Sequence, residues 1–344
     1  AVLMARHTAP KISETTARAI MIRVIFRILL AIPLLVLLAG VGFWFAATAR
    51  ETSTANELLL PESRIFETVH GNLHALEAGP EDGVPVLLIH GSVGWAGLWS
   101  ATTAFLSDQG YRVVALDLPP MGLSDRTSGM DYSRQAQALR ILAVAEALDT
   151  PPLLVAHSFG AGAAVEALIA SSSSFAGGVV IAGALNLGDD GAGMEMPLPL
   201  RSSVVRKGAL ASTVTNTLIT KPLFRQFVHR KDSVTREIVD QLEYPFNRVG
   251  TTGALAEWLP TLLIPPRSAA STDPTRYPEI AVPVALIWGR EDTVTPPEQG
   301  EAIGKALGGT PIFWMDNVGH IPQIEATDAF HQVLRAALDR IEQG

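Results

Sequence analysis

Residues 154–162 read LVAHSFGAG and place Ser158 between a short apolar run and a segment rich in small residues. The apolar run is typical of a buried strand, and the segment that follows is typical of a helix. A sharp turn between strand and helix strains the serine backbone and exposes its hydroxyl, provided that small residues stand two positions before and after it. Ala156 and Gly160 occupy those positions. The stretch therefore predicts a nucleophilic serine, and a serine that merely caps a helix is the alternative.

Similar apolar, β-branched runs recur along the chain, at 84–89, 111–116, 152–156, 178–181, 282–288 and 310–314. Helical stretches lie between or after them, notably at 132–148, 160–170 and 326–341. This alternation predicts an α/β fold, with a mostly parallel sheet and helices on both faces. A hairpin of two runs, 66–70 and 73–77, is expected to precede the parallel strands.

The interval 186–278 breaks the alternation. It contains three helical patches, at 223–228, 233–242 and 252–259, joined by proline-bearing segments. We expect a helical cap over one edge of the sheet, inserted into a core made of 65–185 and 279–344. The length of 344 residues and the 48% apolar content suit one such domain with one large core.

Two later stretches supply partners for the serine. Asp292 ends WGRED after a late strand, and His320 ends NVGH after the last one. A serine hydroxyl needs a base to take its proton, and an imidazole suits that role near neutral pH. The imidazole in turn needs a buried carboxylate that fixes its tautomer. Asp292 is the first choice for this carboxylate, and Glu291 and Asp189 are the alternatives.

Four motifs resemble those of the α/β-hydrolase family. Residues 154–162 are similar to its nucleophile elbow G-x-S-x-G, with alanine in place of the first glycine, and the chain order Ser, Asp, His is the one the family uses. HGSVG at 90–94 resembles the family's oxyanion loop, and DLPPMGLSD at 117–125 resembles a scaffold turn. The resemblance spans roughly 66–341. It implies Ser158 as nucleophile, His320 as base and Asp292 as the orienting acid.

The tetrahedral intermediate of such an enzyme carries an oxyanion that needs two main-chain donors. One should be the N–H of Phe159, directly after the nucleophile. By the resemblance the other is the N–H of Ser92, with Val93 as second choice. His90 and His157 are expected to be structural, hydrogen-bonded or packed histidines.

An uncharged apolar run, ILLAIPLLVLLAGVGFWFAAT at 28–48, precedes the core. As a helix it would span about 30 Å, the thickness of the hydrocarbon layer of a membrane. Five basic residues precede the run, which predicts a cytoplasmic lead at 1–27, a tether at 49–64 and a catalytic domain on the outer side. The alternatives are a buried soluble helix and a signal that is cleaved after Ala47-Thr48-Ala49, which would release a secreted protein. Met4 or Met21 could be the start, and a start at Met21 would favour cleavage.

Composition excludes several classes of function. The formal net charge of -8, without a basic cluster beyond residue 50 that would suit phosphates, argues against a nucleic-acid partner. The chain has no cysteine, so disulfides, thiolate metal sites and a cysteine nucleophile are excluded. We expect no metal site and no cofactor, because neither metal-ligand spacing nor a glycine-rich phosphate loop is present.

The sequence predicts a serine hydrolase that cleaves carboxylic esters with an apolar acyl group through an acyl-serine intermediate. The apolar expectation rests on the cap, which offers Leu223, Phe224, Phe227, Tyr244, Phe246, Trp258 and Leu259. Two alternatives remain open. One is a carbon–carbon bond hydrolase with the same three residues, and the other is a non-catalytic, membrane-tethered binding protein on a hydrolase scaffold. The sequence leaves the natural substrate and the oligomeric state undetermined.

Overall fold

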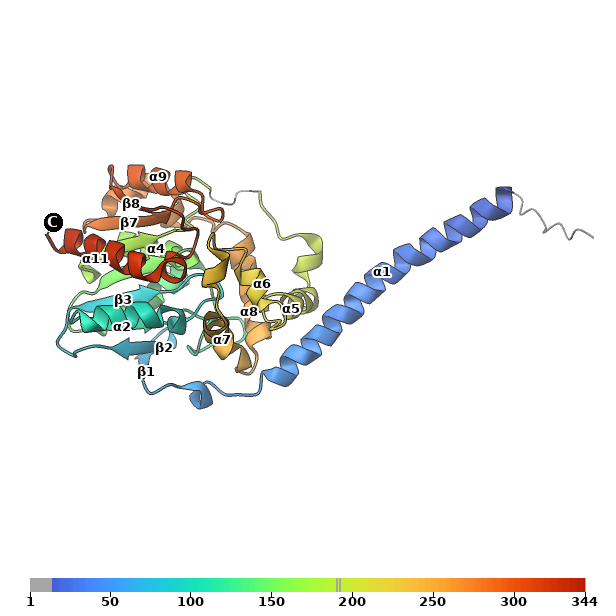
Figure 1. The fold of residues 1–344 in the computed structure, drawn as a ribbon, viewed down its shortest axis with the longest axis horizontal. Coiled ribbons are helices and arrows are strands. Elements are labelled where there is room, and N and C mark those ends of the chain that lie inside the picture. The colour runs from blue at the N-terminus through green and yellow to red at the C-terminus, as the bar shows by residue number, and fades with distance from the viewer. Residues whose placement is uncertain (1–13, 190, 192, 344) are drawn as a thin grey trace, which may run out of the picture.

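A computed structural model describes residues 14–189, 191 and 193–343. Its centre is an eight-stranded sheet of order β1-β2-β4-β3-β5-β6-β7-β8 (Figure 1). The strands are β1 (Ser63–Thr68), β2 (Gly71–Ala78), β3 (Pro85–Ile89), β4 (Arg112–Leu116), β5 (Leu153–His157), β6 (Gly177–Ile181), β7 (Val284–Gly289) and β8 (Ile312–Met315). The β1–β2 hairpin is antiparallel and β2 also pairs antiparallel with β4, whereas the other six strands are parallel. The predicted fold class is confirmed.

Helices cover both faces of the sheet because β3 to β7 are apolar on both sides. One face packs against α3 (Arg134–Glu146), α4 (Phe159–Ala170) and α9 (Pro297–Ala306). The other packs against α2 (Ser100–Asp108) and α11 (Thr327–Gln343), which follows the short α10 (Pro322–Glu325). The sequence reading missed α2 and α9, since their alanines, threonines and glycines give weak helical periodicity.

Between β6 and β7 the chain forms a cap of short helices beside the carboxyl ends of the strands (Figure 1). Its elements are η4 (Leu198–Arg201), α5 (Ser203–Ser212), α6 (Thr220–Phe224), η5 (Lys231–Ser233), α7 (Arg236–Glu243), η6 (Tyr244–Asn247), α8 (Thr251–Leu263), η7 (Ala270–Thr272) and η8 (Pro274–Glu279). The helix α5 was not expected from the sequence. Three further 3-10 turns lie outside the cap, η1 (Asn56–Leu58), η2 (Ala96–Trp99) and η3 (Ser172–Ser174).

The N-terminal helix α1 (Glu14–Arg50) projects away from the rest of the molecule (Figure 1). Within the described residues it is the one helix long and apolar enough to cross a membrane, over Ile20–Arg50, and its most apolar 18-residue window has a mean hydropathy of 2.7. The helix begins at Glu14 and ends at Arg50, so it extends beyond the predicted run 28–48 at both ends. The first half of the predicted lead, residues 1–13, lies outside the described residues.

Candidate active site

Ser158 stands at the turn between β5 and α4 with a φ of 52°. This left-handed conformation is unfavourable for a residue with a side chain and is typical of a strained functional turn. A Cβ added to Gly160 would lie 2.2 Å from the His90 carbonyl oxygen, so only glycine fits there. Ala156 is accommodated in β5 with 1% exposure, so alanine in place of the usual first glycine leaves the turn intact.

Three side chains far apart in the sequence meet at this turn. The His320 Nε2 lies 2.7 Å from the Ser158 Oγ, and the His320 Nδ1 lies 2.9 Å from Asp292 Oδ2. All three residues are buried. Asp292 follows β7 and His320 follows β8, and both loops lie at the same edge of the sheet as the end of β5 because these strands are parallel. The geometry suits a proton passing from serine to an imidazole that a carboxylate orients.

Asp292 accepts hydrogen bonds besides the one from His320. Its Oδ1 accepts from the N–H groups of Val294 and Thr295 at 2.8 and 2.9 Å, and its Oδ2 accepts from the Thr295 hydroxyl at 2.7 Å. Burial by itself would raise the pKa of this carboxyl, but the bonds and charge of His320 and the Thr295 donors hold the pKa below its usual range. Asp292 is therefore a carboxylate at neutral pH.

The two alternative carboxylates lie elsewhere. Glu291 accepts a hydrogen bond from the Val318 N–H at 2.9 Å and thus holds the loop that precedes His320. Asp189 accepts from the Gly191 N–H at 2.9 Å in a turn of the cap. Neither carboxylate contacts the imidazole within the described region, so the geometry favours Asp292.

The predicted oxyanion donors belong to two segments that meet at the elbow. Phe159 begins α4 directly after Ser158, and Ser92 lies in the turn after β3. This turn brings Gly91 so close to the elbow that a Cβ on it would lie 3.1 Å from the Ser158 Cβ. Val93 has a φ of 59°, which is an unusual conformation for a β-branched residue. In the described part of the chain the N–H groups of Phe159, Ser92 and Val93 have no hydrogen-bond partner, so all three are available as donors and the choice of Ser92 over Val93 stays a prediction.

The two neighbouring histidines have structural contacts, as the sequence suggested. His90 accepts a hydrogen bond from the Leu118 N–H at 3.0 Å, and its other ring nitrogen donates to the Gly91 carbonyl. His157 donates from Nε2 to the carbonyl of His320 at 2.8 Å. Burial, together with the proximity of His320, lowers the pKa of His157 to about 3, so this ring stays neutral. His157 therefore fixes the main chain of the proposed base.

Glu325 was missed by sequence reasoning. Its buried carboxylate accepts hydrogen bonds from the N–H groups of Gly319 and Ile321, on either side of His320, at 2.9 and 3.0 Å. It also accepts from the N–H groups of His229 and Arg230 in the cap, at 2.7 and 3.0 Å. One carboxylate thus joins the loop of the base to the cap. The only sequence signal was an acidic residue a few positions after the histidine.

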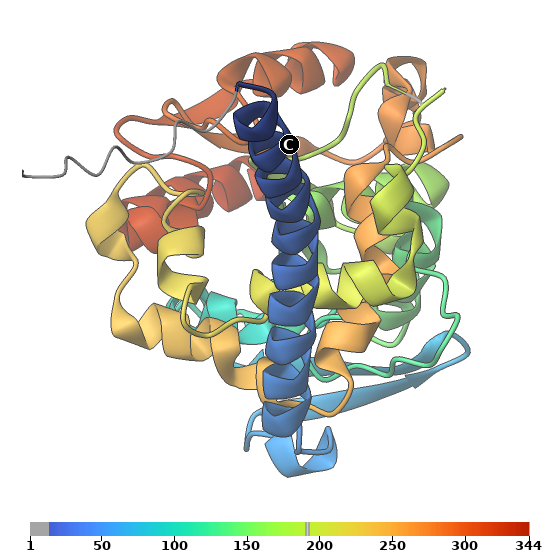
Figure 2. The same ribbon diagram turned by 90° about the vertical axis from the view of Figure 1, so that its right-hand side faces the viewer.

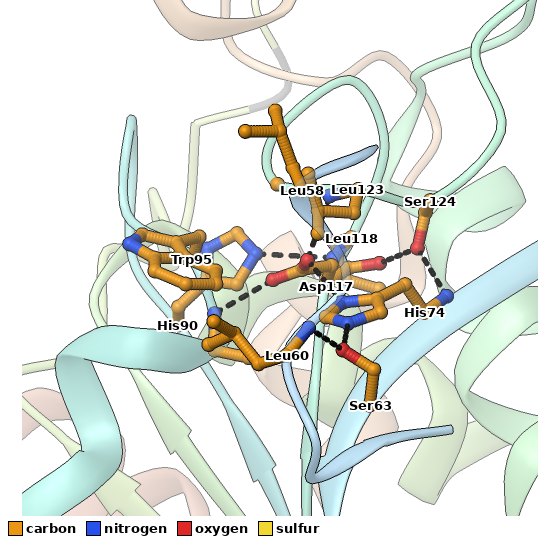
Figure 3. A network of polar contacts seen from close by, with 12 residues as sticks. Leu58, Leu60, Ser63, His74, His90, Trp95, Asp117, Leu118, Leu123 and Ser124 are labelled. Carbon is orange, nitrogen blue, oxygen red and sulfur yellow. Dashed lines mark hydrogen bonds and ion pairs between the residues drawn. The ribbon is translucent and has the colours of Figure 1, made fainter. Parts of the chain in front are cut away.

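A second Ser–His–Asp chain joins β1, β2 and the loop after β4 (Figure 3). His74 bridges the Ser63 hydroxyl at 2.8 Å and Asp117 Oδ2 at 2.7 Å, and Asp117 Oδ1 accepts from the Ala96 N–H at 2.6 Å. The imidazole is fully buried, and the Ser63 oxygen already accepts from the Leu60 N–H. This network ties β2 to η2, which follows the turn that carries Ser92, and it agrees with a scaffold role for the 117–125 motif.

The surroundings of Ser158 are mostly apolar. The Phe159 ring packs edge-on against Trp258 of α8, with 5.3 Å between ring centres. Two cavities of about 10 Å³ lie near the elbow, and each has room for about one water molecule. Met121 lines both, with Phe159 and Ala163 in one and with Val93 and Phe246 in the other. Not every cap residue expected near the site lies there, since Phe227 is 40% exposed and Tyr244 stacks on Trp95.

The described residues contain no group of three or more His, Asp or Glu side chains that could hold a metal ion. The sheet order, the strained elbow and the inserted cap instead define the class of α/β hydrolases. The chain belongs to the alpha/beta hydrolase family, whose model matches residues 86–333.

Individual relatives differ in chemistry. The chain is 27% identical, over 256 residues, to a 2-hydroxy-6-oxononadienedioate/2-hydroxy-6-oxononatrienedioate hydrolase of Dechloromonas aromatica, covering 72% of this chain and 84% of the relative. Among solved structures it is similar to a putative lipase from Acinetobacter baumannii, with a TM-score of 0.65, 20% identity and coverage of 88% and 97%. It is also similar to a membrane phospholipase A described as a bacterial virulence factor, with a TM-score of 0.61, 20% identity and coverage of 95% and 100%.

Proposed function

We propose that this protein is a membrane-tethered serine hydrolase that cleaves carboxylic esters with an apolar acyl group. The observation that carries the proposal is the unbroken chain of hydrogen bonds from Ser158 through His320 to Asp292. It lies beside main-chain N–H groups that have no partner among the described residues, and next to apolar side chains of the cap.

The reaction follows from these positions. The Ser158 Oγ attacks the ester carbon while its proton passes to His320 Nε2, and Asp292 stabilises the resulting imidazolium. The N–H groups of Phe159 and Ser92 bind the oxyanion. His320 then gives the proton to the leaving alkoxide, which leaves an acyl group on Ser158. A water molecule, deprotonated by His320, hydrolyses this acyl-serine and restores the hydroxyl.

Carbon–carbon bond hydrolysis is the second candidate, because the Dechloromonas relative carries the name of such an enzyme. The substrate in that name is a dioate, and two carboxylates need cationic partners. The cavities beside the elbow contain Arg126 and Arg134. Arg126 already donates to the carbonyls of Pro120 and Val249, and Arg134 donates to those of Ala184 and Leu185. These engaged guanidinium groups favour an uncharged ester.

The membrane tether is the other part of the proposal. The stretch 28–48 is uncharged, and Arg18, Arg23 and Arg27 precede it. This asymmetry supports an N-terminus in the cytoplasm and a catalytic domain on the outer side. The likeness to the membrane phospholipase A covers 95% of this chain and so includes part of α1. Resistance of the full chain to extraction by alkaline carbonate tests the tether, and a mature N-terminus near Arg50 would contradict it.

Labelling with a fluorophosphonate probe tests the chemistry. We expect the full chain to be labelled on Ser158 and the Ser158→Ala variant to be unlabelled, with p-nitrophenyl ester hydrolysis lost in parallel. Ser124→Ala is a matched control, because Ser124 is also buried and lies in the scaffold turn. A Ser158→Ala variant that kept every activity would contradict the proposal and favour a binding protein. Faster turnover of a ring-fission dioate than of any ester would favour the carbon–carbon hydrolase.

A further inference from the structure

The cap contains a basic stretch that the sequence reading missed when it found no basic cluster beyond residue 50, and the proposed reaction does not use it. Residues 196–231, here called the basic cap segment, carry seven basic residues and no acidic one, although the formal net charge of the chain is -8. The seven are Arg201, Arg206, Lys207, Lys221, Arg225, Arg230 and Lys231. The segment forms η4, α5, α6 and the first residue of η5. A run of like charge is often only a solvated face, so its position on the molecule matters.

Large apolar side chains are exposed in the same segment. Leu198 is 75% exposed, Val204 is 53% exposed, Leu218 is 81% exposed and Phe227 is 40% exposed. Basic and exposed apolar side chains together are typical of elements that lie in the interface of a membrane, where the apolar groups enter the acyl boundary and the cations meet anionic headgroups. A merely solvated face would not need these apolar groups.

The basic cap segment is packed against the membrane-spanning candidate α1 (Figures 1 and 2). Gly40 of α1 meets Gly208 of α5 so closely that a Cβ on Gly40 would lie 3.9 Å from the Gly208 Cα. The Lys207 Nζ lies 5.9 Å from the centre of the Trp44 ring. The Arg50 guanidinium donates to the Thr215 carbonyl. The cap is thus fixed to the last turns of α1.

The position of Gly40 along α1 determines how deep in the membrane α5 lies. The uncharged run ends at Thr48, and Gly40 lies eight residues earlier, about 12 Å along the helix axis. If 28–48 fills the hydrocarbon layer, an upright α1 would place α5 about 12 Å below its edge. A tilt of about 20° reduces this depth only slightly, so α5 reaches into the membrane and its Lys and Arg side chains must extend outward to meet the headgroups. Shifting α1 outward would instead draw Arg27 and Arg23 into the hydrocarbon, which is costly.

We infer that the basic cap segment docks onto the anionic headgroup layer of the membrane that α1 spans. This inference rests on the membrane tether of the proposed function. The docked segment contacts the active site directly, since the Phe227 carbonyl accepts from the His320 N–H at 3.3 Å and Arg230 donates to Glu325. Leu210 of α5 belongs to an apolar cluster that also contains Met121 and Trp258, and Phe159 packs against this cluster. Apolar side chains thus extend from the docked segment to Phe159, the residue that follows Ser158.

The chain has no cysteine, so a single introduced cysteine gives a unique label. The test uses the full chain in vesicles, with an environment-sensitive fluorophore on Leu218→Cys and a nitroxide quencher on lipid headgroups. Leu35→Cys, in the middle of α1, reports on insertion of the helix. Val69→Cys, 94% exposed in the turn between β1 and β2, is the water-exposed control.

In vesicles of equimolar phosphatidylcholine and phosphatidylglycerol, we expect quenching at position 218 but not at position 69. Quenching at 218 should fall about twofold or more in pure phosphatidylcholine, because the cations lose their anionic partners. The double variant Lys221→Glu, Arg225→Glu should reduce it in the mixed vesicles, whereas Arg340→Glu on α11 should not.

Two results would overturn the inference, and they are distinguishable. A label at 218 that stays as unquenched as the one at 69, while the label at 35 enters the bilayer, would refute docking and leave the tether intact. A label at 35 that remains in water would refute the tether and the docking together. Neither readout depends on catalysis, so failure of ester hydrolysis is detected separately.

Discussion

Replacing Glu325 by glutamine is expected to weaken both the fold and the proposed activity. In the native site the Glu325 Oε2 accepts hydrogen bonds from the N–H groups of Gly319, His229 and Arg230, and the Oε1 accepts one from the Ile321 N–H. A glutamine can place its side-chain carbonyl oxygen where the Oε2 lies and so keep these three hydrogen bonds. Its NH2 group then faces the Ile321 N–H, donor against donor.

The cost follows from these contacts. One buried N–H is left unpaired, at about 1–3 kcal/mol, and three bonds to a charged acceptor become bonds to a neutral one. Together this gives roughly 3–6 kcal/mol of lost stability, or a fall of about 10 °C in the apparent Tm of a domain of this size. Because the lost bonds flank His320, we also expect kcat to fall by about 10- to 100-fold, with little change in KM.

The assay combines thermal unfolding of the full chain in detergent with the rate of fluorophosphonate labelling. Glu291→Gln is the matched control, since among the described residues this partly exposed carboxylate accepts one hydrogen bond, from Val318. It should cost about 1 kcal/mol and leave the labelling rate nearly unchanged. If Glu325→Gln behaved like Glu291→Gln in both measurements, the role assigned to this carboxylate would be wrong.

Three further predictions concern the elbow and its partners. Asp292→Asn should lower kcat by about 10⁴-fold, as the equivalent change does in serine proteases, while Asp189→Asn should not change it, and equal effects on ester turnover would contradict the assignment. Gly160→Ala should abolish fluorophosphonate labelling and lower the apparent Tm, because the new Cβ would lie 2.2 Å from the His90 carbonyl oxygen. A fully active variant would show that the elbow is looser than described. The pKa of His157 is about 3 in the folded chain and about 6.5 in the unfolded chain. Between these pH values the unfolded chain binds one proton more than the folded chain. The free energy of unfolding therefore falls by about 1.4 kcal/mol for each pH unit as the pH drops from about 6.5 to about 3. His157→Gln, which keeps a donor for the His320 carbonyl, should flatten the decline of the apparent Tm between neutral pH and about pH 4, and an unchanged slope would refute this.

The amino-acid sequence was sufficient for the fold class and for the order of the sheet-forming runs. Strands such as β3 and β5 are buried on both faces, so their residues are apolar without interruption and can be recognised one by one. The elbow was also recognisable, because the close approach of strand and helix restricts the residues on either side of Ser158 to small ones. Asp292 and His320 were chosen from their positions after late strands.

The tertiary structure decided what depends on contacts between distant segments. The sequence left Asp292, Glu291 and Asp189 as alternatives, and only the distances to the His320 ring separate them. Apart from an acidic residue a few positions after His320, the sequence did not indicate that Glu325 joins the loop of this ring to the cap, since the four N–H donors that it binds are main-chain groups that no side-chain pattern encodes. The packing of α5 against α1 was likewise visible only in the structure. The periodicity of a sequence indicates which face of a helix is apolar, but not which other helix packs against that face.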